Sequence, residues 1–357
     1  MNQEDYSQNL NIGITQGDLN GVSYELVINT LLKDDMRYST PVFFGTPKLV
    51  SYFRKICKAN HFNFNLVKDK KITNNKPNLV NIYSKEVKVN IGNVSEEAAE
   101  LAVMSLDNVY EYAKNGFLDS IVCCPITKGL INTILPDFIS NSHYLANKFK
   151  VQNSLKLYCN DFIKITALDN NAHFKDLNDV IQEDNIFNKI THLNNILKYD
   201  FKISLPKIAV IALNGVSNNG TFDAKEEHII AKAIEKAVNN NIYVYGPYDA
   251  KQLFLENEYA AFDAIITMRE QQAITIFTLL EGINGYVYTA GLPFVVTEPF
   301  HDSMYKIAGQ NVASLEGFSN AMFASYKLTL NKKESKELLS NSLPISDKSS
   351  VKIQEQD

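Results

Sequence analysis

The sequence contains no tryptophan, few cysteines and histidines, and no excess of positive charge. With a formal net charge of −5, the chain lacks the basic footprint that nucleic acids and membrane surfaces require, so neither is an expected partner. No apolar run approaches the roughly 20 residues that cross a bilayer, and the start, MNQEDYSQN, lacks the basic-then-apolar pattern of a secretory signal. We therefore expect a cytoplasmic protein.

The four cysteines indicate neither a disulfide framework nor a zinc site. No pair has the spacing of a zinc ribbon, and adjacent residues such as Cys123 and Cys124 rarely bridge to each other. These two end an apolar run, LDSIVCCP, which predicts buried thiols in a reduced compartment. We attribute the absence of tryptophan, alongside abundant Asn and Lys, to nucleotide bias in the source genome.

What the chain does contain is a repeated alternation of strand and helix patterns, with 45% apolar residues to fill a core. This alternation predicts an α/β fold with a largely parallel sheet and helices on both faces. The expected strands are Asn11–Thr15, Thr40–Gly45, Asn78–Tyr83, Leu118–Cys124, Leu155–Tyr158, Phe162–Ala167, Lys207–Leu213, Ile242–Gly246, Ala264–Thr267, Tyr286–Thr289 and Phe294–Thr297. The fifth and sixth have the spacing of a hairpin.

Helical spacing of apolar residues predicts the remaining elements. The expected helices are Gly21–Leu32, Pro47–Cys57, Asn93–Lys114, Leu145–Phe149, Phe174–Ile181, Asp184–Leu197, Ala224–Asn239, Lys251–Glu256, Gln272–Leu280 and Ser314–Tyr326. Ser95 is the expected N-cap of the third. The charged, Ser-rich residues 331–357 have too little apolar surface to offset ordering entropy, which predicts a disordered tail.

The stretch Phe262–Gly309 holds the residues on which function depends. Strands at Ala264–Thr267 and Tyr286–Thr289 bracket a helix, and Gly291–Pro293 introduces another strand. The strand ends carry Arg, Glu, Gln, Thr, His and Asp. An open α/β sheet places its ligands at such strand ends, so this stretch is the expected site of a small-molecule ligand.

Two helix starts are candidate anion sites. Gln16, Gly17 and Asp18 follow the first strand, and free backbone N–H groups at the next helix would face a ligand. Most α/β proteins have such a turn as plain structure. Lys128 opens the helix after Leu118–Cys124, where it can bind a phosphate or carboxylate or simply be solvated. The residues alone leave both interpretations open.

Nine short motifs, in this order, resemble the 4-hydroxythreonine-4-phosphate dehydrogenase (PdxA) family of vitamin B6 biosynthesis. They span residues 12 to 325, and their order is more specific than any one of them. The matching pieces are Ile14–Val22, Cys124–Gly129, Ser142–Tyr144, Lys175-Asp176, Leu213-Asn214, Gly246–Tyr248, Phe262–Ala264, Gly291–Phe294 and Ile307–Gly309.

The resemblance implies two α/β domains with a cleft between them, similar to isocitrate and isopropylmalate dehydrogenases. The first domain would comprise residues 1–130 plus 295–330, and the second 131–294. Family members are homodimers with active sites at the subunit boundary. They use NAD to oxidise a phosphorylated hydroxy amino acid, whose keto acid then loses carbon dioxide, and a divalent metal held by three histidines polarises the reacting oxygen.

This chain departs from the family pattern at all three metal positions. Where the family has its histidines, the chain has Asn171, Val216 and Glu270. Val216 cannot coordinate a cation, and the other two are hard oxygen groups that match a site built from imidazoles poorly. We therefore predict no family-type metal site.

Three substrate contacts of the family are also replaced. Its Lys is Thr278, its Asn is Val287, and its Arg is Val296. Each lost charge-assisted contact to phosphate or carboxylate costs roughly 1.5 to 3 kcal/mol. The substrate-binding candidates that remain are His143, Lys128, Asp18 and His301. The candidates for binding the cofactor, NAD, are Asn214, Gly220, Gly246 and Pro247.

Three hypotheses follow from these departures. The favoured one is a degenerate family member that keeps the fold and the homodimer but not the metal-dependent dehydrogenation. The second is an active NAD-dependent dehydrogenase with a changed substrate or a metal site rebuilt from His173, Glu270, Glu298, His301 and Asp302. The third is an unrelated α/β binding protein or transferase.

Overall fold

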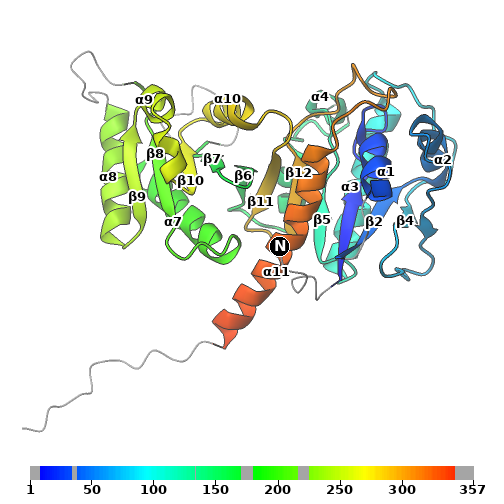
Figure 1. The fold of residues 1–357 in the computed structure, drawn as a ribbon, viewed down its shortest axis with the longest axis horizontal. Coiled ribbons are helices and arrows are strands. Elements are labelled where there is room, and N and C mark those ends of the chain that lie inside the picture. Colours follow the sequence, from blue (N-terminus) through cyan, green and yellow to red (C-terminus); the bar gives the residue numbers. More distant parts are fainter. Residues whose placement is uncertain (1–8, 34–37, 133, 170–179, 216–224, 342–357) are drawn as a thin grey trace, which may run out of the picture.

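The computed structural model describes residues 9–33, 38–132, 134–169, 180–215 and 225–341. Its described strands form one twelve-stranded sheet, shown edge to edge along the molecule in Figure 1. The order across the sheet is β3 (Asn65–Leu66), β4 (Asn78–Asn81), β2 (Ser39–Gly45), β1 (Leu10–Thr15), β5 (Ser120–Val122), β12 (Val295–Pro299), β11 (Tyr286–Ala290), β6 (Leu155–Cys159), β7 (Lys164–Ala167), β10 (Ala264–Thr267), β8 (Lys207–Ile211) and β9 (Tyr243–Tyr248). The predicted α/β fold is confirmed.

The sheet is parallel except at its middle. There β11 is antiparallel to both of its neighbours, β12 and β6, and β6 is antiparallel to β7 as the predicted hairpin requires. The parallel strands on either side therefore run in opposite directions. This change of direction falls where residues 155–290 meet residues 10–122 and 295–299. The domain boundaries themselves stay a prediction.

Helices cover both faces of the sheet (Figure 1). They are α1 (Ser23–Lys33), α2 (Pro47–Ile56), α3 (Glu96–Lys114), α4 (Lys128–Ile131), α5 (Asn141–Lys148), α7 (Glu183–Tyr199), α8 (Lys225–Asn239), α9 (Ala250–Leu255), α10 (Glu270–Glu281) and α11 (Glu316–Ser340). The expected helix Phe174–Ile181 lies mostly outside the described residues. No described helix combines the length and apolar character needed to cross a membrane.

Serine caps set the start of two helices. The Ser95 Oγ atom accepts a hydrogen bond from Ala98 N, which confirms the predicted cap of α3. The Ser140 Oγ atom likewise accepts from His143 N at 3.2 Å, so α5 begins at Asn141. The prediction that this helix starts near Leu145 was wrong, because the cap lies one turn earlier than the first apolar residue.

The prediction of a disordered tail from residue 331 was wrong for its first part. Helix α11 continues to Ser340, and polar contacts hold it where apolar burial is sparse. Asn331 Nδ2 donates to Asp200 O at 2.8 Å, and Ser335 Oγ donates to Tyr199 O at 2.7 Å. The prediction of disorder considered only the apolar content of the segment and could not include such contacts, which is why it was wrong here. Residues 342–357 lie outside the described part.

Two groups of buried side chains make up the core. The larger one extends under α1, α3, α7 and α11, and it includes Cys57, Cys123, Cys124 and Cys159. All four thiols are buried and free, which confirms the burial predicted for Cys123 and Cys124. The smaller group lies beneath α10, around Phe277. It therefore supports the helix that presents Glu270 to the candidate site.

Candidate functional site

A cavity of about 270 Å³ lies beside the three central strands, on the face of the sheet that α10 covers. We call it the cleft cavity. Its polar lining comes from the segment before α5, from β6 and from the end of β12. The lining residues are Pro125, Ile126, Phe138–Asn141, Lys156, Tyr158, Ile274, Val287 and Glu298–Asp302. Strand ends meet at this point, as at ligand sites of other open α/β sheets.

Strand register brings the charged groups of this cavity together. Tyr158 on β6 pairs with Val287 on β11, and Val287 pairs with Glu298 on β12. Opposed residues in neighbouring strands share a face, and alternate residues along one strand do too. Lys156, two residues before Tyr158, therefore projects to the same side as Glu298.

Glu270, at the start of α10, is held by two partners from β6. Its Oε1 atom lies 3.2 Å from Lys156 Nζ and accepts a hydrogen bond from Tyr158 OH at 2.7 Å. The two charged side chains are 24% and 12% exposed, which limits screening of the ion pair by water. Burial, reinforced by Glu270, raises the pKa of Tyr158, so the phenol remains a proton donor.

Glu298 forms the other acidic wall of the cleft cavity. Burial raises the pKa of its carboxyl, while the charge of Lys156 and a hydrogen bond from Asn141 act in the opposite direction. Asn141 Nδ2 donates to Glu298 Oε2 at 3.0 Å and to Cys124 O at 3.3 Å. These two acceptors fix the orientation of the amide, and its buried Oδ1 atom has no hydrogen-bond partner within the described chain.

His301 adds a second acceptor to this cavity. Its Nδ1 atom lies 2.9 Å from Asp302 O, a carbonyl that can only accept, so Nδ1 carries the proton and Nε2 does not. The Nε2 atom is buried and makes no hydrogen bond to a described residue. Burial lowers the pKa of the ring, which keeps it neutral.

The three residues predicted to stand at the family's metal positions do not fit a divalent metal held by imidazoles. Glu270 is the one of the three that the structure describes, and its Oε1 atom already bonds Lys156 and Tyr158. Val216 has no donor atom on its side chain, and Asn171, like Val216, lies outside the described residues. Throughout the described ranges, no group of three or more His, Cys, Asp or Glu side chains is arranged to hold a metal.

Asp18 and Tyr305 form a buried pair beside the cleft cavity, not in its lining. Asp18 is fully buried, and it accepts hydrogen bonds from Tyr305 OH and from Asn20 N. Its own backbone N donates to Pro125 O at 2.9 Å. Burial raises the pKa of its carboxyl. Asp18, which was predicted to bind the ligand, thus connects the turn after β1 to the segments that contain Pro125 and Tyr305.

His143 lies on α5 and lines a neighbouring cavity of about 330 Å³. Both ring nitrogens lie 3.5 Å from Asn147 Nδ2. Tyr144 OH donates to Asp107 Oδ1 at 2.7 Å, which directs the phenol toward α3. Lys128 is the first residue of α4, and its side chain is not among the described ones. The structure therefore separates His143 from His301 by placing them in different cavities.

Three of the four predicted cofactor residues lie in or directly after the last two strands of the sheet, β8 and β9. Gly246 and Pro247 lie in β9, joined by a cis peptide bond. Asn214 follows β8, and its backbone N and its Nδ2 atom both donate to Glu227 Oε1, at 2.7 and 3.3 Å. Gly220 lies outside the described residues. NAD binding at these positions stays a prediction.

Three residues of the cleft cavity were not predicted from the sequence, namely Asn141, Lys156 and Tyr158. Lys156 carried a usable signal, because it is the one charged residue in the apolar strand LKLYC. Asn141 carried none, since its role depends on a partner 157 residues away.

Comparison with known proteins places this architecture among PdxA-type dehydrogenases. The sequence profile described as "Pyridoxal phosphate biosynthetic protein PdxA" matches residues 37–325. The 4-hydroxythreonine-4-phosphate dehydrogenase of Bacteroides thetaiotaomicron is 31% identical over 338 residues, covering 94% of this chain and 93% of that protein. Crystal structures of the enzymes named so from Burkholderia phymatum and Klebsiella pneumoniae share the fold, with TM-scores of 0.71 and 0.73 and identities of 21% and 18%. Each covers 90% of this chain and 99% of the other.

Proposed function

The chain belongs to the PdxA family of pyridoxal phosphate biosynthetic proteins, a family of dehydrogenases, and from this premise we propose that it is a pseudoenzyme of that family. In this proposal the protein keeps a ligand-binding cleft and the homodimer but does not perform metal-dependent oxidation of 4-hydroxythreonine 4-phosphate.

The proposal depends on the contacts that the Glu270 carboxylate makes. A carboxylate at a metal position has to direct its oxygens at the ion, yet Glu270 Oε1 bonds Lys156 Nζ and Tyr158 OH. The ammonium of Lys156 supplies positive charge between Glu270 and Glu298, where the family relies on a metal cation. A divalent cation there would have to displace Lys156 or be repelled by it.

The positions that hold the family's anionic substrate support the same proposal. Val287 lines the cleft cavity, and Val296 is 2% exposed in the core. Thr278 is exposed, and its Oγ1 atom donates to Ile274 O within its own helix. None of these three side chains carries a positive charge that could form an ion pair with a phosphate or a carboxylate.

The cleft cavity instead favours a ligand that donates hydrogen bonds. Three acceptors belong to its lining, namely Asn141 Oδ1, His301 Nε2 and the carboxylate of Glu298. Buried acceptors without partners are costly, and a hydroxyl or ammonium group would satisfy them. A small polyol or amine therefore fits this site better than a phosphorylated acid.

The test is an assay of the purified protein with NAD and 4-hydroxythreonine 4-phosphate, in the presence of Mg²⁺, Mn²⁺ or Zn²⁺ and again with EDTA. We expect no NADH formation that depends on metal. The Bacteroides thetaiotaomicron relative, assayed in parallel, serves as the positive control for substrate and cofactor. Turnover that metal stimulates and EDTA abolishes would overturn the proposal.

A second candidate function is an NAD-dependent dehydrogenase with a changed substrate. The observation that favours it is the grouping of Lys156, Tyr158 and Glu298 at one cavity, because such groups can transfer protons. A panel of hydroxy acids and diols tests it by NADH formation that resists EDTA and is lost in Lys156→Met. The related idea of a rebuilt metal site depends partly on His173, which lies outside the described residues.

A further inference from the structure

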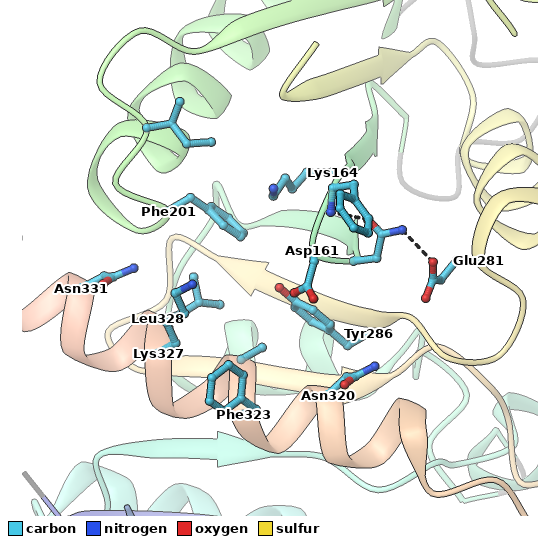
Figure 2. A pocket seen from close by; sticks show the side chains of 14 residues that line it. Asp161, Lys164, Phe201, Glu281, Tyr286, Asn320, Phe323, Lys327, Leu328 and Asn331 are labelled. Atoms are coloured by element: carbon cyan, nitrogen blue, oxygen red, sulfur yellow. Dashed lines mark hydrogen bonds between the residues drawn. The ribbon is translucent and has the colours of Figure 1, made fainter. Parts of the chain in front are cut away.

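A second cavity lies on the opposite face of the same central strands. We call it the α11 cavity, and its volume is about 330 Å³. Figure 2 shows α11 on one side of it and Phe201 and Lys164 on the other. Tyr286 lines this cavity, whereas the next residue, Val287, lines the cleft cavity. Successive residues of a strand point to opposite faces, so the two cavities are separate sites.

Lys164, the first residue of β7, is the unusual member of this lining. It is 8% exposed, and its strand partner Cys159 belongs to the buried core. Its ammonium lies 5.3 Å from the centroid of the Phe201 ring. Over the ranges that the structure describes, this ammonium has no carboxylate within ion-pair distance and makes no hydrogen bond to another side chain.

Packing alone does not explain a lysine whose side chain is buried and whose ammonium has no ion pair among the described residues. Lysine is almost never buried to this extent without a partner, because the loss of hydration is only partly offset by an aromatic face. The usual partners are carboxylate or phosphate oxygens. Since the residues that the structure describes offer none to Lys164, we look for the missing partner in a bound ligand.

The rest of the lining indicates where an anion would sit. Lys327, on the exposed side of α11, makes no ion pair to a described residue and adds a second positive charge. Glu281 also lines the cavity, and it accepts a hydrogen bond from Asn160 Nδ2 at 2.7 Å (dashed line in Figure 2). Asp161 lies on the exposed β6–β7 connection, so the negative charge is at the edge and Lys164 is at the buried end.

We propose that the α11 cavity binds a small organic anion, whose carboxylate or phosphate group pairs with Lys164 and Lys327. The aromatic rings of Phe201, Tyr286 and Phe323 form the apolar part of the lining. They suit a ligand with a flat or branched apolar body attached to the anionic group. This site is independent of the function proposed for the cleft cavity.

Calorimetric titration of the full chain with benzoate, phenyl phosphate and inorganic phosphate tests the proposal. We expect saturable binding of at least one probe, and comparison of the three distinguishes a carboxylate site from a phosphate site. Lys164→Met keeps the apolar stem and removes the charge, so its affinity should fall at least tenfold. Lys48→Met, at an exposed lysine paired with Glu86, is the matched control and should bind as the unmodified protein does.

Two further measurements separate a binding lysine from a structural one. Lys327→Met changes an exposed residue that is not needed for folding, and it should weaken probe binding severalfold. Without any probe, Lys164→Met should melt at the same temperature as the unmodified protein, because the ammonium makes no ion pair to a described residue. Equal probe affinity in all variants, or no saturable binding of any probe, would overturn the proposal.

Discussion

The ammonium of Lys156 lies 3.2 Å from the Glu270 carboxylate and also acts electrostatically on Glu298. One lysine thus balances two acidic side chains that belong to different halves of the sheet, since Glu270 begins α10 and Glu298 ends β12. The positive charge beside these two carboxyl groups therefore comes from a side chain of the protein.

Lys156→Met should destabilise the protein, because it leaves Glu270 without its cation. For a pair that is partly exposed we expect a loss of about 1–3 kcal/mol in the free energy of unfolding, less than for a fully buried pair. Denaturation with urea provides the measurement. The double variant Lys156→Met/Glu270→Gln should recover part of the loss. If the single variant is as stable as the unmodified protein, the pair has no structural role.

Much of the fold could be predicted from the sequence because it depends on local patterns. The β6–β7 hairpin, the Ser95 cap and the burial of Cys123 and Cys124 all follow from residues close together in the chain. The site could not be predicted in the same way. Lys156 and Glu270 are 114 residues apart, and their contact depends on where β6 enters the sheet. Local sequence patterns do not encode the position at which β6 enters the sheet.

Gly246→Ala should be strongly destabilising. Gly246 has a φ of +128°, a backbone angle that residues other than glycine rarely adopt. An added Cβ would lie 2.5 Å from Val210 O. The neighbouring atom is backbone of β8 and cannot move without disturbing the strand. We expect a loss of at least about 2 kcal/mol, measured by urea denaturation. Gly129→Ala, in α4 with no atom within 4 Å of the added Cβ, is the control and should change stability little.

The last turns of α11 should contribute to stability through Asn331 and Ser335. Asn331→Ala and Ser335→Ala each remove a hydrogen bond to a backbone carbonyl, so each should lower the free energy of unfolding by about 1 kcal/mol. Ser340→Ala removes a bond within the helix at its exposed end and should have a smaller effect. If none of the three substitutions changes stability, these hydrogen bonds do not hold the end of α11 in place.

Glu298 should make the protein less stable as pH rises from acid to neutral. Burial raises the pKa of its carboxyl above the ordinary value of 4.5. Below pH 4.5 both the folded and the unfolded state carry the proton. In the window between 4.5 and the raised pKa, the folded state keeps a proton that the unfolded state has lost, so the stability from this group declines as pH increases. Above that window the full penalty of the buried charge remains.

Glu298→Gln can still accept a hydrogen bond from Asn141 and has no charge, so it should be more stable than the unmodified protein at pH 7, with the difference closing near pH 4. Thermal denaturation across this range measures both curves. Glu86→Gln, at a residue whose side chain is 96% exposed, should show no such divergence. A Glu298→Gln variant that is less stable at pH 7 would mean that the attraction of Lys156 outweighs burial at this position.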